Sequence, residues 1–124
     1  MKAAILVLAD PKSGSDEANA RVFNALASAY DFKQRGSDVK ILFQGAGTRW
    51  PSVLANKEHP SHDLYEQVKD KVDGVSCGCA DAFGVSEEAK ACGLELKTDL
   101  AVPGTSGLAS VGGLVEDGYN VLSF

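Results

Sequence analysis

The chain opens with an uninterrupted apolar run, Ala3 to Leu8, which limits the available folds more than any other stretch. A strand with one face in water alternates apolar and polar residues. A run that is apolar at every position is typical of a strand buried on both faces of a parallel sheet. Similar runs follow at Val39 to Phe43 and Val72 to Val75, with weaker ones at Leu94 to Leu100 and Tyr119 to Phe124. We therefore predict a mostly parallel five-stranded sheet.

Helical segments are expected between these runs. The pattern places them at Asp16 to Arg35, from Pro51 onward, after a cap at Ser61, at Ser86 to Cys92, and at Leu108 to Asp117. Strands that alternate with helices along the chain form α/β folds in which the helices cover the sheet. The prediction is an α/β fold, with residues 1–124 forming a single three-layer α/β/α domain.

The longest of these segments, Asp16 to Arg35, predicts which side chains enter the core. Val22, Phe23, Leu26 and Tyr30 fall on one stripe of a helix. We expect this stripe to pack on the sheet.

The charge balance and the cysteine count limit the classes of function. The 124 residues include 17 acidic and 12 basic side chains, a net charge of −5. Binding to phosphates is driven mainly by Lys and Arg, so nucleic acid and a membrane surface are not expected as partners. Met1 and Lys2 lead straight into the first strand, and no secretory leader is expected. Three cysteines, an odd number, indicate free thiols in a reducing compartment and hence a cytoplasmic protein.

In an open parallel sheet, ligands bind outside the carboxyl ends of the strands. The loops predicted at that edge are Asp10 to Ser15, Gln44 to Trp50, Ser76 to Asp81 and Val102 to Gly107. Candidate substrate-binding residues from three of these loops are Asp10, Gly45, Gly47, Arg49, Trp50 and Gly78. Arg49 can offer a positive charge to an anion, and Trp50 can form a lid, although packing in the core or at a subunit interface explains Trp50 equally well.

The segment Val75 to Gly84 carries the candidate nucleophiles, Cys77 and Cys79. A helical turn is expected from Ala80, which places Cys79 at or just before a helix N-terminus, where the unpaired N–H groups stabilise a thiolate. Gly78 permits a sharp turn and a close approach of substrate. Asp81 acts in the opposite direction, because a nearby carboxylate disfavours the thiolate.

Each cysteine also has a structural interpretation. Cys79 can be a small buried residue at a strand end, as most free cysteines are. Cys77 can be a resolving thiol, although a Cys-x-Cys disulfide is strained, or a strand-end side chain that points away from its neighbour. Cys92 is expected to pack at a helix end.

The remaining motifs are weaker. His59 and His62 could join the two cysteines in a zinc set, but Cys-x-Cys is poor for tetrahedral chelation, and surface histidines are the preferred interpretation. The glycines at Gly45 to Gly47 and Gly104 to Gly107 match no phosphate-binding fingerprint and are explained by turns. No metal and no cofactor are predicted.

With this pattern in view, the chain resembles the DsrE/DsrF-like family of small sulfur-relay and sulfur-oxidation proteins over nearly its whole length. The resemblance rests on four segments in order: the first strand with its Asp10 loop and long helix, Val39 to Phe43 with its glycine loop, Cys79 to Val85, and Gly118 to Phe124.

This resemblance implies that Cys79 accepts and passes on sulfane sulfur as a persulfide, a sulfurtransferase-like activity. The implied partners are sulfur-donor and sulfur-acceptor proteins or small thiols, and the implied assembly is a homo-oligomer, a trimer or a hexamer. The alternative is a non-catalytic oligomeric module that binds a nucleotide or another anion at the same edge of the sheet.

Overall fold

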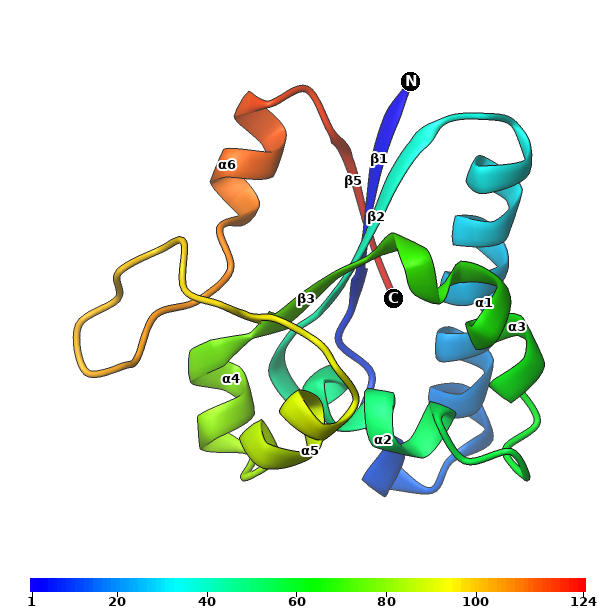
Figure 1. Cartoon of the computed structure of the whole chain (residues 1–124), viewed down its shortest axis with the longest axis horizontal. Coiled ribbons are helices and arrows are strands. Elements are labelled where there is room, and N and C mark those ends of the chain that lie inside the picture. The colour runs from blue at the N-terminus through cyan, green and yellow to red at the C-terminus, as the bar shows by residue number, and fades with distance from the viewer.

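The computed structural model describes all 124 residues and contains one parallel sheet (Figure 1). Its strands are β1 (Lys2–Val7), β2 (Asp38–Phe43), β3 (Val72–Ser76), β4 (Leu96–Lys97) and β5 (Asn120–Ser123), in the order β4-β3-β2-β1-β5. All four pairings are parallel, which confirms the predicted α/β fold and extends "mostly parallel" to the whole sheet.

The central strand β1 is buried on both faces, as its composition requires. Residues 3–7 are all within the interior, and Ile5 pairs with Ile41 of β2 on one side and with Leu122 of β5 on the other. The two edge strands are shorter than their apolar runs. β4 keeps two of the seven residues expected at Leu94 to Leu100, because only Leu96 and Lys97 pair with β3.

The larger core lies between one face of the sheet and helix α1 (Asp16–Gln34), whose first residue is preceded by the Ser15 cap. The buried stripe of α1 consists of small and aliphatic residues: Ala18, Val22, Ala25, Leu26 and Ala29. The prediction that Phe23 and Tyr30 belong to this stripe is wrong, because they are 50% and 38% exposed. Alanines at three of the five positions let α1 approach the sheet closely. The rings of Phe23 and Tyr30 point outward.

The opposite face of the sheet has a thinner cover, formed by α6 (Val111–Glu116) and the segment before it (Figure 1). Its core has six buried residues, including Leu42 and Leu114. The helix begins three residues later than Leu108. Leu108 instead exchanges two backbone hydrogen bonds with Leu100, each of 2.8 Å, and Ser110 caps the helix.

Short helices gather at the carboxyl ends of the strands, in the lower part of Figure 1. They are η1 (Pro11–Ser13), η2 (Gly45–Arg49), α2 (Trp50–Leu54), α4 (Cys77–Ala82) and α5 (Ser86–Ala91). Helix α3 (His62–Val68) and the turn η3 (Lys69–Lys71) return the chain alongside α1 to the start of β3. No helix has both the length and the apolar character needed to cross a membrane.

Candidate functional site

Helix α4 begins at Cys77, directly after β3, and not at Ala80 as predicted. Gly78 explains this early start. Its N–H donates to the Gly107 carbonyl at 2.7 Å, and a Cβ at Gly78 would lie 2.7 Å from Cδ2 of Leu108. The space opened by this glycine is therefore filled by the segment before α6, which fixes the backbone of the first turn.

Cys77 and Cys79 point to different sides of α4. An α-helix turns about 100° per residue, so side chains two positions apart do not face each other. All three cysteines of the chain are free. A disulfide between Cys77 and Cys79 would require their sulfur atoms on the same side of the helix. The helical geometry therefore argues against Cys77 as a resolving thiol.

Cys79 shares its helix face with Phe83, four positions later. The Phe83 N–H donates to the Cys79 carbonyl at 3.0 Å, so the helical turn continues to this ring. Cys79 is half-buried, and its sulfur has no hydrogen-bond partner in the protein. No hydrogen bond within the protein would therefore have to break before this thiol reacts.

Cys77 shares its face with Asp81 and is tied to it through a third residue. Sγ of Cys77 lies 3.3 Å from Oγ of Ser106, and this hydroxyl donates to Oδ2 of Asp81. Ser86 donates to the other carboxylate oxygen at 2.6 Å. The hydroxyls of Ser106 and Ser86 hold the pKa of the Asp81 carboxyl below its ordinary value. The carboxylate thus lies on the Cys77 side of α4.

Arg49 and Asp10 join the loops that follow β2 and β1. Nη1 of Arg49 lies 3.0 Å from Oδ1 and 3.1 Å from Oδ2 of Asp10. The guanidinium also lies over the Phe83 ring, with its central carbon 4.9 Å from the ring centroid. The backbone N–H of Lys12 is the main cause that lowers the pKa of Asp10; burial opposes it, and the hydrogen bond and charge of Arg49 lower the pKa further. Nε of Arg49 is buried and has no partner.

Trp50 is fully buried at the start of α2. Its indole N–H donates to the carbonyl of Ala9 at 2.8 Å, and the His59 ring packs edge-on against it, with centroids 6.0 Å apart. Trp50 therefore forms a fixed wall between the β1 loop and the segment before α3. In this position it is not a mobile lid.

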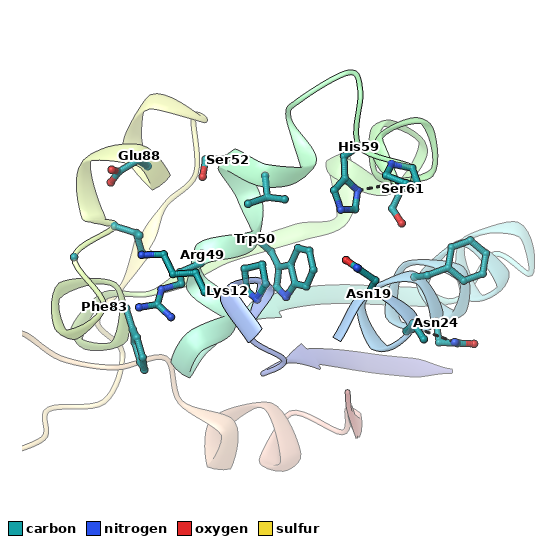
Figure 2. Close-up of a pocket in the computed structure, with 17 residues that line it drawn as sticks. Lys12, Asn19, Asn24, Arg49, Trp50, Ser52, His59, Ser61, Phe83 and Glu88 are labelled. Carbon is teal, nitrogen blue, oxygen red and sulfur yellow. Dashed lines mark hydrogen bonds between the residues drawn. The ribbon is translucent and has the colours of Figure 1, made fainter. Parts of the chain in front are cut away.

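These residues border the largest cavity of the molecule, about 890 Å³ in volume (Figure 2). Figure 2 shows Arg49 and Phe83 at one end, Trp50 and His59 in the middle, and Asn24 at the other end. Lys12 adds a second positive charge and Glu88 a negative one. The wall is otherwise rich in apolar surface from Phe23, Val53 and Val85. Neither Cys77 nor Cys79 lines this cavity.

The two glycines of η2 have structural roles in this arrangement. A Cβ on Gly47 would collide with the carbonyl of Val7, so only glycine lets η2 pass over the end of β1. Gly45 has a φ of 54°, a conformation that favours glycine. Both roles position Arg49, the last residue of η2.

The histidines and Cys92 do not combine with Cys77 and Cys79 in a metal site. Nδ1 of His59 accepts from the Ser61 N–H at 3.1 Å, and Nδ1 of His62 lies 2.7 Å from the Leu54 carbonyl. No three His, Cys, Asp or Glu side chains come together in an arrangement that could hold a metal ion. Burial raises the pKa of the Cys92 thiol, which is half-buried at the end of α5.

Sequence reasoning did not single out Phe83, Ser86 or Ser106 as site residues. For Ser106 the sequence does hold a signal, because the alternation of strands and helices predicts the loop Val102 to Gly107 at the functional edge. Its contact with Cys77 spans 29 positions of the chain. For Phe83 the only signal in the sequence is its position four residues after Cys79, which is about one helical turn.

With this geometry established, comparison with known proteins identifies the family. The family model of the DsrE/DsrF-like family matches residues 1–124, the whole chain. The chain belongs to the DsrE/DsrF-like family. This result confirms the resemblance seen in the four sequence segments.

A curated relative of this DsrE/DsrF-like chain comes from Methanocaldococcus jannaschii and is described as an uncharacterized protein. It is 33% identical over 102 residues, which cover 82% of this chain and 78% of the relative. Comparison with solved structures gave no match.

Proposed function

We propose that this protein carries sulfane sulfur as a persulfide on Cys79. The observation that carries the proposal is the state of this thiol: half-buried in the first turn of α4, at the carboxyl edge of the sheet, with no hydrogen-bond partner. Membership in the DsrE/DsrF-like family supports sulfur relay as the kind of chemistry.

The transfer needs no oxidant or reductant. The Cys79 thiolate attacks the terminal sulfur of a donor persulfide, R–S–SH. A new S–S bond forms to Cys79, and the S–S bond of the donor breaks to release R–S⁻. An acceptor thiolate then attacks the outer sulfur of Cys79 and releases the Cys79 thiolate again. The protein thereby returns to its starting state, with a thiolate as the leaving group in each step.

The partners, the oligomeric state and the cellular compartment are proposed as expected from the sequence. Donor and acceptor are proteins or small molecules with a persulfide and a thiol, and the chain acts as a homo-oligomer in the cytoplasm. The free state of all three cysteines supports a reducing setting.

Sulfur loading tests the proposal directly. The purified protein is reduced, incubated with glutathione persulfide, and analysed by site-resolved mass spectrometry. We expect one added sulfur atom on Cys79. Cys79→Ser should abolish loading, and the matched variant Cys92→Ser, which removes the thiol at the end of α5, should load like the wild type. Absence of sulfur on Cys79 in folded wild-type protein would refute the proposal.

The large cavity favours a second candidate function, the binding of a small anion with an apolar body. Arg49 and Lys12 supply positive charge, the buried Nε of Arg49 lacks a partner, and Phe83 offers aromatic surface. Its volume of about 890 Å³ lies within the range of small-molecule sites.

This candidate is tested with ADP as the probe, by isothermal titration calorimetry. Binding should be lost in Arg49→Gln. It should persist in Arg21→Gln, a matched removal of an exposed arginine that pairs with Glu17 on α1. Cys79→Ser separates the two functions, because it should abolish sulfur loading and leave ADP binding unchanged.

A further inference from the structure

Two thiols lie in the first turn of α4, yet they differ in their hydrogen bonds. Cys77 is hydrogen-bonded to Ser106, whereas the sulfur of Cys79 has no hydrogen-bond partner in the protein. A sulfur carrier with two half-buried thiols in one helical turn could accept sulfur on either. The hydrogen-bond chain at Cys77 therefore bears on which thiol reacts.

The direction of the hydrogen bond between Cys77 and Ser106 follows from Asp81, the third residue of this hydrogen-bonded series. A serine hydroxyl has a single hydrogen to donate, and an ionised carboxylate only accepts. Ser106 donates its hydrogen to Oδ2 of Asp81. Asp81 is ionised at neutral pH, because its ordinary pKa of 3.8 lies far below 7 and the hydroxyls of Ser106 and Ser86 lower this pKa further. Oγ of Ser106 can therefore only accept from Cys77, and the donor is the S–H group.

A thiolate at Cys77 would break this arrangement. Its negative charge would face the lone pairs of the Ser106 oxygen, with the Asp81 carboxylate one hydrogen bond behind. Like charges and acceptor-to-acceptor contacts disfavour the charged form. Because the thiolate is the nucleophile, a cysteine kept as a hydrogen-bond donor attacks slowly.

The Asp81 and Ser106 end of this hydrogen-bond network borders a cavity of about 490 Å³, whose wall also includes Thr105. Cys77 itself is half-buried and does not line this cavity.

We propose that Asp81, acting through Ser106, keeps Cys77 in its thiol form and so directs incoming sulfur to Cys79. This selection rests on the proposed sulfur-carrier function. Asp81 and Ser106 are positioning residues in this scheme, since neither touches the sulfur that is transferred.

The variant Asp81→Asn should reverse the effect. Ser86 donates to Oδ1 of residue 81, which holds the amide oxygen there and places the amide nitrogen at Ser106. The nitrogen then donates to Ser106, and the freed hydroxyl hydrogen of Ser106 turns to the Cys77 sulfur. We expect alkylation of Cys77 by iodoacetamide to become about tenfold faster, because hydrogen bonds to a charged group are the stronger ones.

Three further variants separate this mechanism from a general loosening of the loop. Ser106→Ala removes the acceptor without supplying a donor, so the rate at Cys77 should rise less than in Asp81→Asn. Ser106→Thr keeps the hydroxyl, so Cys77 should be alkylated at the wild-type rate. Ser86→Ala removes a hydroxyl that bonds Asp81 but does not touch Cys77, and should leave that rate unchanged.

The readout is site-resolved mass spectrometry of iodoacetamide adducts, with circular dichroism as the check of folding. The rank order Asp81→Asn, Ser106→Ala, wild type, from fastest to slowest, supports the inference. Equal rates at Cys77 in folded Asp81→Asn and wild type would overturn it. Sulfur loading is measured separately: if Cys79 takes up no sulfur, the carrier proposal fails, while the alkylation rates still report on the control of Cys77. In Asp81→Asn, sulfur should appear on Cys77 as well as on Cys79.

Discussion

Arg49 donates to both carboxylate oxygens of Asp10 through one nitrogen, at 3.0 and 3.1 Å, and thereby ties the loop after β2 to the loop after β1. The two residues are 39 positions apart in the sequence. The same guanidinium packs on Phe83, which follows α4. One side chain thus links the segments that follow three strands at the functional edge.

This ion pair predicts how stability responds to acid. The Lys12 N–H and Arg49 lower the pKa of Asp10 from its ordinary 3.8, so the folded state favours the ionised carboxylate. The contribution of Asp10 is therefore present above that ordinary value and is lost as the pH falls through the lower folded pKa. In urea titrations from pH 7 to pH 2, Asp10→Asn should lose less of its unfolding free energy than the wild type. A wild-type curve that coincides with that of Asp10→Asn over this range would contradict the role of the Asp10 and Arg49 pair.

Gly47 should not tolerate a side chain. A Cβ there would overlap the carbonyl of Val7 in the central strand, and overpacking against backbone costs about 1–3 kcal/mol or more. Gly47→Ala should lower the urea midpoint accordingly and displace Arg49. Gly112→Ala, in α6, meets no atom within 4 Å and should raise the unfolding free energy by about 0.5–1 kcal/mol. Equal midpoints for the two variants would contradict this account.

Trp50→Phe should weaken the wall of the large cavity. The change removes the indole donor, leaves the Ala9 carbonyl without its partner, and opens a void in the core. A buried acceptor left unpaired costs about 1–3 kcal/mol. Unfolding should be followed by circular dichroism, because Trp50 is the only tryptophan of the chain. An unchanged unfolding free energy would mean that Ala9 finds another donor.

Cys92 should be slow to react in the folded protein. Burial raises the pKa of this thiol, so a smaller fraction is thiolate at pH 8 than in the unfolded chain. Alkylation of Cys92, read by mass spectrometry, should therefore be slower without urea than in urea. Equal rates in the two conditions would show that the end of α5 opens on the timescale of the reaction.

The order of the elements could be predicted from the sequence, but their ends could not. Apolar runs report burial on both faces, which is a local property, and the three central strands agree with it closely. The extent of β4 depends on which residues find partners on β3, and the start of α6 depends on Leu108 pairing with Leu100. The helical spacing of Phe23 fits the core stripe and predicts burial, but the neighbouring alanines permit a closer approach of α1 to the sheet and the ring is exposed.

The sequence by itself determined that this is a parallel α/β chain of the DsrE/DsrF-like type, with Cys77 and Cys79 at the carboxyl edge of the sheet. Hydrophobic patterning suffices for the fold class, since it is a property of neighbouring residues, and the four matching segments suffice for the family resemblance. Only the tertiary structure decided that the two thiols differ. Ser106 reaches Cys77 across 29 positions, and the direction of one hydroxyl hydrogen depends on Asp81. Contacts between segments that are distant in sequence, and the hydrogen-bond directions they impose, leave no local pattern in the chain.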